Sequence, residues 1–327
     1  MRGRGPTMMG SRTLTSLLDQ QSSVLRTQLD GIYDGSVDAV HNARVATRRI
    51  RELLSLVPIV PGRDGEEDVA ASCKVMGRAL GKVREVDVQI ALISDLETRA
   101  AQAAPPLVLL RQDHERERLA KMRRLIKTLE RLDVDILLHG VTDSQPTGLR
   151  TRLTSTGWRQ QLRHLVVERA HNALDAISHA TGVYFPRRAH GARIAIKQLR
   201  YAAEIAEATG HSDMRAGIRT LKKGQEILGD LHDRQVLADT LEAYASRDGV
   251  DPVHVRFPQE VLESEILHLH AEYLARRASL REACSDIEHI VSRVFRPAPA
   301  IAISSALAVS GLLYAGVRSH AGRVAES

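Results

Sequence analysis

Two stretches of this sequence carry the same pattern of basic residues, and a second pattern also occurs twice at almost the same distance. The first pattern, His41-Asn-Ala-Arg44-Val-Ala-Thr-Arg48-Arg-Ile-Arg51, recurs 149 residues later as His190-Gly-Ala-Arg193-Ile-Ala-Ile-Lys197-Gln-Leu-Arg200. The second, Leu80-Gly81-Lys-Val-Arg84-Glu85, recurs 148 residues later as Leu228-Gly229-Asp-Leu-His232-Asp233. Either pair could arise by chance, but the shared offset indicates a duplicated unit. A chain of this kind is therefore expected to fold as two related halves.

The spacing of apolar residues predicts helices nearly everywhere, because they recur every three or four residues and alternating β-branched runs are scarce. The predicted helices cover residues 11–32, 36–57, 64–80, 85–104 and 105–138, and then residues 151–180, 186–209, 213–228, 232–246 and 258–294. Ser36 is expected to cap the second helix, whereas Gly81 and Gly229 are expected to interrupt helices. The predicted fold is all-α, with two pseudo-symmetric antiparallel helical bundles, each a four- to five-helix unit.

The expected organisation along the chain is a disordered N-terminus (1–10), a first half (11–140), a linker (141–157), a second half (158–296), an apolar segment (297–317) and a tail (318–327). No apolar signal-peptide core follows the basic N-terminus, so we expect a cytoplasmic location. Residues 298–317 contain no charged residue and have the length of a membrane span. That stretch is either a membrane tail anchor or a terminal helix that packs on the core or stays loosely ordered.

Composition narrows the class of protein further. Aromatic residues make up only 3% of the chain, which argues against base-stacking modules such as RRM and OB folds. The two cysteines, Cys73 and Cys284, form no C-x-x-C motif, so neither a disulfide framework nor a cysteine-based zinc site is expected. The formal net charge of +6 favours an anionic partner.

The repeated basic residues share one face of each predicted helix. At about 100° per residue, the four cationic positions of each copy lie within about 80° of one another and extend over about 15 Å. A solvated helix face usually mixes charge signs, yet neither interval 39–51 nor interval 176–203 contains an acidic residue. Such a row fits a run of anions, and arginine suits it because its planar fork binds phosphate oxygens in pairs.

Further basic residues extend this pattern on the helices that follow. Lys74 in the first unit corresponds to Lys222, which is followed by Lys223. Arg78 and Lys82 continue the row in the first unit, whereas the residues at the corresponding positions of the second unit are Glu226 and Asp230. These two cations of the row therefore have no basic counterpart in the second unit.

Residues 34–51 and 79–88, together with the matching segments 190–201 and 221–233, resemble the signature of the CHAD family (conserved histidine α-helical domain), and the resemblance extends over residues 11–296. It implies two helical bundles that enclose a basic groove or pore. It also implies binding of inorganic polyphosphate without catalysis, often at polyphosphate granules. The binding residues that it implies are His41, Arg44, Arg48, Arg51, His190, Arg193, Lys197 and Arg200, with Lys74, Lys222 and Lys223 as secondary candidates.

The resemblance implies no catalytic residue, no metal ligand and no cofactor. The chain departs from the family pattern at Glu85, where aspartate is usual, and at His232, which occupies the position of Arg84. No Walker A loop or G-x-G-x-x-G motif occurs, and no Glu-x-Glu-x-Lys strand of a joined triphosphate-tunnel enzyme is recognisable. We therefore expect a standalone binding protein.

Two alternatives belong to other functional classes. A basic helical protein could bind nucleic acid, although no base-reading motif is evident and aromatic residues are scarce. A metal-dependent phosphohydrolase of the His-Asp type is less favoured; His232-Asp233, with His190 and His211 upstream, would supply its ligands. A membrane contact through residues 298–317 is a further expected interaction if that segment is an anchor.

Overall fold

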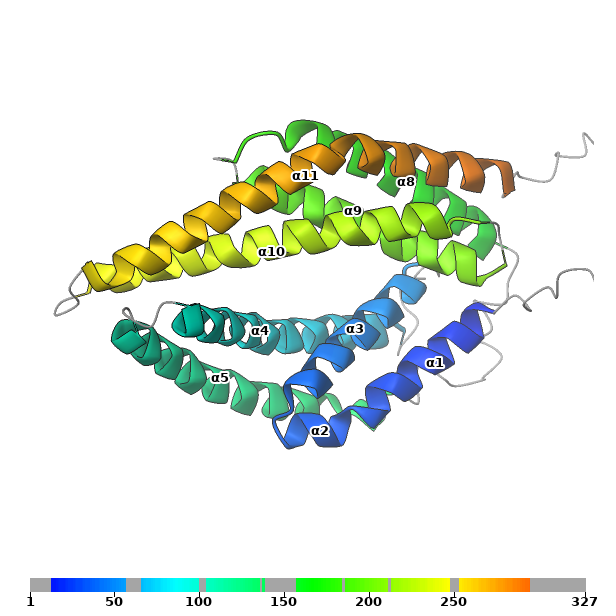
Figure 1. Ribbon diagram of the computed structural model, residues 1–327. Helices are drawn as coiled ribbons and strands as arrows, with labels where there is room; N and C mark the ends of the chain where they lie inside the picture. Colours follow the sequence, from blue (N-terminus) through cyan, green and yellow to red (C-terminus); the bar gives the residue numbers. More distant parts are fainter. Residues whose placement is uncertain are drawn as a thin grey trace, which may run out of the picture. The chain divides into compact units, whose positions relative to one another are not determined.

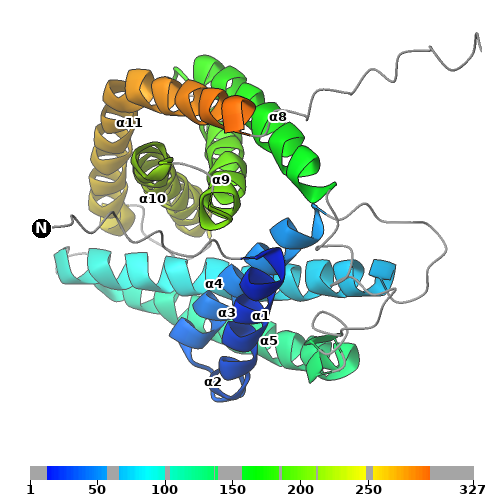
Figure 2. The same ribbon diagram turned by 90° about the vertical axis from the view of Figure 1, so that its right-hand side faces the viewer.

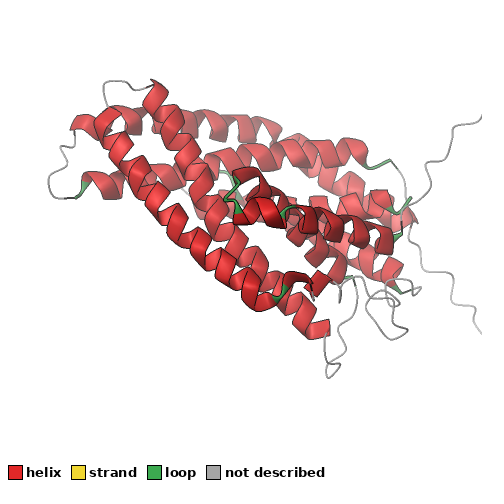
Figure 3. Cartoon of the chain, turned by 90° about the horizontal axis from the view of Figure 1, so that it is seen from below, coloured by secondary structure: helices red, strands yellow, loops and turns green. Residues whose placement is uncertain are grey.

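Helices account for almost all of the residues that the structure describes, and those residues contain no strand (Figure 3). The computed structural model describes residues 13–56, 66–99, 104–135, 137–138, 157–183, 186–210, 213–247 and 253–294. All of them belong to one compact unit, Met1–Phe295. The predicted all-α fold class is confirmed for this part of the chain.

The first half contains α1 (Leu14–Thr27), α2 (Leu29–Tyr33), α3 (Val37–Leu54), α4 (Glu66–Arg99) and α5 (Ala104–Leu132). Helix α1 packs on α3, α3 on α4, and α4 on α5. As predicted, Ser36 caps α3, because its hydroxyl accepts a hydrogen bond from the backbone N–H of Ala39 at 3.3 Å. Gly35, with a φ of 79°, allows the tight turn that leads into this helix.

The second half contains α8 (Trp158–His179), α9 (Pro186–Ala208), α10 (Arg215–Ala245) and α11 (Val253–Val294). Each helix packs on the next, and α11 also packs on α8. Pro186 is the first residue of α9, as its fixed φ and missing N–H favour. Helix α11 begins before Pro258 and not at it, so this proline lies inside the helix.

The predicted helix breaks at Gly81 and Gly229 are wrong. Helix α4 runs without interruption from Glu66 to Arg99, and α10 runs from Arg215 to Ala245. A glycine in a helix interior costs only about 1 kcal/mol relative to alanine. Burial of the apolar residues beside each glycine, Leu80 and Val83 in α4 and Leu228 and Leu231 in α10, outweighs that cost.

Figures 1 and 2 show α1 to α5 on one side of this unit and α8 to α11 on the other. Buried apolar residues from both sets of helices form one continuous core. A second core cluster lies where α4 and α5 meet α10 and α11; it contains Ile93, Leu96, Leu107, Leu110, Leu237, Leu241, Tyr244, Val255 and Leu262. Helix α3 contacts α9 across the boundary, which brings the two copies of the repeat together.

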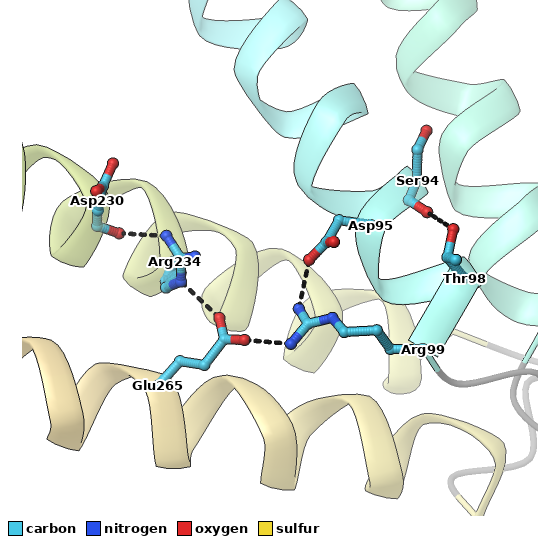
Figure 4. Close-up of polar contacts among 7 residues, drawn as sticks. All are labelled: Ser94, Asp95, Thr98, Arg99, Asp230, Arg234 and Glu265. Carbon is cyan, nitrogen blue, oxygen red and sulfur yellow. Dashed lines mark hydrogen bonds and ion pairs between the residues drawn. The ribbon is translucent and has the colours of Figure 1, made fainter.

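An ion-pair network joins the halves near this second cluster (Figure 4). The carboxylate of Glu265 on α11 accepts hydrogen bonds from Arg234 of α10, at 2.5 Å, and from Arg99 of α4. Arg99 also pairs with Asp95 at 2.6 Å. Burial alone would raise the pKa of Glu265, but its hydrogen bonds to the two arginines lower that pKa overall.

Both cysteines are free, buried thiols on different helices, Cys73 on α4 and Cys284 on α11. Burial raises the pKa of each thiol to about 12. They therefore pack as small apolar side chains in the core.

Several expectations fall outside the described residues. These are the disordered N-terminus over 1–10, the linker over 141–157 except Gly157, the apolar segment over 297–317 and the tail over 318–327. Among the helices that the structure describes, none combines the length and the apolar composition that crossing a membrane requires.

Candidate functional site

Cations from both copies of the repeat meet at the boundary between α3 and α9. Arg44 and Arg48 come from α3, and Arg193 and Lys197 come from α9; we call these four residues the central cluster. Burial lowers the pKa of Arg44, and the positive charges of Arg48 and Arg193 lower it further. Since this electrostatic effect acts across the two halves, these cations of α3 and α9 lie near one another.

Lys197 is the most perturbed member of the central cluster. Burial lowers its pKa from 10.5 to about 8, and the charges of Arg48, Arg193 and Arg44 act in the same direction. A lysine in this position loses hydration and gains like-charged neighbours, so its ammonium is destabilised in the folded protein. An anion placed among these side chains would reverse that effect.

The glycines of the second repeated motif lie beneath the arginines of the first. A Cβ atom on Gly81 would lie 3.7 Å from Nε of Arg44, and one on Gly229 would lie 3.5 Å from Nε of Arg193. Each arginine therefore lies across a helix that lacks a side chain at that point. This arrangement explains why the two motifs repeat together: one supplies the guanidinium and the other the space for it.

The carboxylates near the central cluster are fewer than its cations. Glu52 faces Lys197 but already pairs with Arg169 of α8 at 2.6 Å. Asp233 of α10 lies near Arg193 and Arg44, and burial raises its pKa although these cations lower it. Glu85 lies on α4, and its negative charge raises the pKa of Arg44. The cluster therefore keeps a positive excess.

Tyr201 holds one member of the central cluster in place. The guanidinium of Arg48 donates a hydrogen bond from Nη1 to the Tyr201 hydroxyl at 2.7 Å, which links α3 to α9. Tyr201 is buried, and the guanidinium of Arg200 lies over its ring, 4.4 Å from the centroid. A second link across the halves runs from Gln89 Nε2 to the backbone carbonyl of Asp233, at 3.2 Å.

The two predicted histidines have different surroundings. His41 is exposed, and partial burial together with the charges of Arg84 and Arg44 lowers its pKa. His190 is partly buried with its ring centroid 4.4 Å from that of His232. Burial lowers the pKa of both His190 and His232, the latter to about 4, with the other ring contributing for His232. All three rings are thus mostly neutral at pH 7 without a bound anion.

The last cation of the stripe differs between the two copies. Arg51 is exposed, and its Nη1 lies 3.8 Å from where a Cβ on Gly77 would be. Arg200, its counterpart, is only 9% exposed; it donates to Gln225 at 3.0 Å and pairs with Glu204. The structure therefore gives Arg200 a carboxylate partner and buries its guanidinium over the Tyr201 ring, whereas the prediction placed Arg200 in one row with the other cations.

The secondary lysines also differ in their partners. Lys74 is exposed on α4 and has no carboxylate partner in the part of the chain that the structure describes. Lys222 lies 3.8 Å from Glu226, and Lys223 lies 3.7 Å from Glu272.

Sequence reasoning missed three residues that lie at the site. Arg84 of α4 acts electrostatically on His41 and Arg44, and Asp233 lies among the same cations. The second motif contained a signal for Arg84 and Asp233. It places polar residues in both copies on the helices that pack against the two cationic helices, so those residues lie near the cations. Tyr201 had no such signal, since its hydroxyl reaches a residue 153 positions away.

The His-Asp phosphohydrolase alternative finds no metal-binding group in the described residues. Within the described ranges, no three His, Cys, Asp or Glu side chains are grouped so that they could hold a metal ion. His211, one of the residues invoked for that alternative, lies outside them.

Comparisons with known proteins agree with the resemblance. The family model described as CHAD domain matches residues 16–242. The crystal structure of the CHAD domain from the plant Ricinus communis matches with a TM-score of 0.57 and 20% identity, covering 87% of this chain and 96% of that chain. PptA from Streptomyces chartreusis matches with a TM-score of 0.59 and 16% identity, covering 83% and 98%. At these identities the two structures support the fold alone.

A search of curated protein sequences found no match. The family assignment therefore depends on the domain model, which spans well over half of the sequence. This chain belongs to the CHAD domain family.

Proposed function

We propose that this protein binds inorganic polyphosphate, without catalysis, through the central cluster. The observation that carries the proposal is the convergence of Arg44 and Arg48 with Arg193 and Lys197 from the other half, close enough that the charges of Arg48 and Arg193 lower the pKa values of Arg44 and Lys197. Like charges are held together here at a cost in stability. A polyanion would supply the missing negative charge, so the arrangement favours binding over folding.

A linear phosphate polymer suits the cluster better than a single small anion does. Polyphosphate carries about one negative charge per phosphate, and the central cluster offers it four cations from two helices. Three of the four members are arginines, whose guanidinium remains charged and binds phosphate oxygens bidentately. Among the described residues, the buried Nε of Arg193 has no hydrogen-bond partner, so the charge of this guanidinium is only partly compensated within the protein.

The test is titration of the full chain with long-chain polyphosphate at two salt concentrations. The variant Arg48→Glu/Lys197→Glu reverses one cation from each half. We expect its affinity to fall by about 100-fold or more at low salt, because both electrostatic contacts and counterion release are lost. The control is Arg123→Glu/Lys127→Glu, which changes the net charge equally at exposed positions of α5. Equal affinity in wild type and the cluster variant would refute the site.

The same titration separates the alternatives. If DNA of matched charge competes as well as polyphosphate does, nucleic acid becomes the better assignment, because a phosphate backbone alone then satisfies the cluster. If phosphate is released from polyphosphate when Mn²⁺ is added, the protein is a hydrolase. We expect neither result.

We also propose that the protein resides in the cytoplasm, at polyphosphate granules. This location depends on residues 297–317, because a membrane anchor in that segment would direct the protein to a membrane. Cell fractionation of the full chain and of a chain that lacks residues 297–327 checks this. Recovery of only the full chain with membranes would assign the anchor.

A further inference from the structure

The two halves differ sharply in charge beside the central cluster, at positions that the repeated motifs align with one another. In the first half the exposed residues next to the cluster are Arg51 of α3 and Lys74, Arg78 and Lys82 of α4, which we call the first-half arm. At the corresponding positions of the second half are Arg200, Lys222, Glu226 and Asp230. The first half therefore has four cations at these positions, whereas the second half has two cations and two carboxylates.

The first-half arm continues the central cluster along α4. Arg44 lies over Gly81, and Arg51 lies over Gly77, one helical turn or about 6 Å further toward the N-terminus of α4. Lys74 follows about 4.5 Å beyond Gly77, and Arg78 lies beside it, four residues away on the same helix. No member of the arm has an ion-pair partner among the side chains that the structure describes.

In the second half, the equivalent surface is neutralised. Gln225 occupies the position of Gly77 and, with Glu204, holds Arg200 in a buried position. Glu226 replaces Arg78 and lies 3.8 Å from Lys222. Asp230 replaces Lys82 and is exposed. A polyanion that extended in this direction would meet carboxylates where the first half offers cations.

We propose that a long polyphosphate chain leaves the central cluster along the first half only, over Arg51, Lys74, Arg78 and Lys82. This inference rests on the proposed function, and it assigns an extended subsite that only long chains reach. A short anion such as triphosphate occupies the central cluster alone. Chain-length preference therefore arises from the asymmetry between the halves, because the first half extends the cationic surface and the second ends it.

The experiment compares two charge-matched double variants of the full chain. Lys74→Glu/Arg78→Glu changes the arm. Lys222→Glu/Lys223→Glu changes the net charge by the same amount at the two secondary candidates of the second half, which this inference excludes from the binding surface because they lie near Glu226 and Glu272. Each protein is titrated with triphosphate and with long-chain polyphosphate at low salt. All four substituted side chains are exposed, so thermal unfolding should show that both variants fold.

We expect the arm variant to lose about 10-fold or more in affinity for the long chain and less than about 3-fold for triphosphate. The second-half variant should lose less than about 3-fold for both. Its salt dependence for the long chain should match that of wild type, whereas the slope for the arm variant should be shallower by about 1 to 2 units.

Two results would overturn the inference and leave the proposed function standing. One is an equal loss of long-chain affinity in both variants, which would mean that the polymer follows both halves. The other is an equal loss for triphosphate and the long chain in the arm variant, which would mean that the arm belongs to the short-anion site. If wild type binds neither ligand, or if Arg48→Glu/Lys197→Glu binds as wild type does, the proposed function fails and the inference with it.

Discussion

At the scale of one residue, Lys197 shows that keeping a positive charge at the candidate site lowers the stability of the folded protein. Its ammonium is partly buried between Arg48 and Arg193, and its pKa lies near 8 in place of 10.5. The unfolded chain therefore binds more protons than the folded protein between about pH 8 and 10.5. By linkage, the free energy of unfolding should rise as the pH increases through that window.

Replacing Lys197 by methionine tests this cost directly. We expect Lys197→Met to raise the free energy of unfolding at pH 7 by about 1–2 kcal/mol, after allowance for solvent screening of the half-buried group. The rise between pH 8 and 10.5 should also disappear. Urea unfolding at several pH values measures both effects, and Lys127→Met on exposed α5 is the control. If Lys197→Met were less stable than wild type at pH 7, the claim that the Lys197 charge destabilises the folded protein would be wrong.

Binding should couple to the same proton. A bound polyanion favours the charged ammonium, so complex formation near pH 8 should take up protons, and affinity should fall as the pH rises above about 8. Calorimetry in buffers of different ionisation enthalpy detects the uptake. In Lys197→Met the remaining uptake should come only from the histidines, at lower pH.

At the scale of the helix, three glycines serve different purposes. Gly81 and Gly229 leave space for arginines that lie across α4 and α10, at distances of ordinary van der Waals contact. Gly224 of α10 instead allows close packing on α11, because a Cβ there would lie 2.5 Å from Cδ2 of Leu280. Leu280 is fully buried, and three of its side-chain atoms lie within 3.2 Å of that Cβ position.

These differences predict opposite effects of the same substitution. Gly81→Ala should stabilise the protein by about 0.5–1 kcal/mol, since alanine is the better helix former and its methyl group meets no clash. Gly224→Ala should destabilise it by about 1–3 kcal/mol through overpacking. Chemical denaturation measures both. Polyphosphate affinity should be unchanged in Gly81→Ala and reduced in Gly81→Leu, whose side chain would displace Arg44; an unchanged affinity in the leucine variant would argue against that arrangement.

At the scale of the whole helical unit, repulsion and attraction act at different places along the boundary between the halves. The central cluster sets like charges against one another, whereas Glu265 binds Arg99 of one half and Arg234 of the other (Figure 4). The second core cluster contributes apolar contacts from both halves. Attraction near Glu265 therefore offsets repulsion near Lys197.

Glu265→Gln should lower the free energy of unfolding by about 1–2 kcal/mol at pH 7, because two arginines lose their shared carboxylate. The pKa of Glu265 is lowered in the folded protein, so its contribution is present above about pH 4.5 and lost as the pH falls through the folded-state pKa. Wild type and variant should thus converge in stability once the pH falls below the folded-state pKa of Glu265. Glu260→Gln, which breaks only an exposed pair with Arg256, should cost less than about 0.5 kcal/mol.

Much of the fold followed from patterns that are local in sequence. Three- and four-residue spacing of apolar residues predicted helices, and the Ser36 cap was confirmed, since both depend on groups within one or two turns. Helix breaks at Gly81 and Gly229 were predicted wrongly because the local cost of glycine was weighed without the packing on either side. The candidate stripe was predicted residue by residue, but its partners were not.

The amino-acid sequence by itself determined the helical class and the face of each helix that carries Arg44, Arg48, Arg193 and Lys197, because periodicity within a helix decides which residues point the same way. The two repeated motifs are likewise visible in the sequence alone. Only the tertiary structure decided that these two faces meet, that Tyr201 holds Arg48, and that Arg200 is buried against Gln225 and Glu204. Those outcomes depend on contacts between side chains up to about 150 residues apart, and no local pattern encodes them.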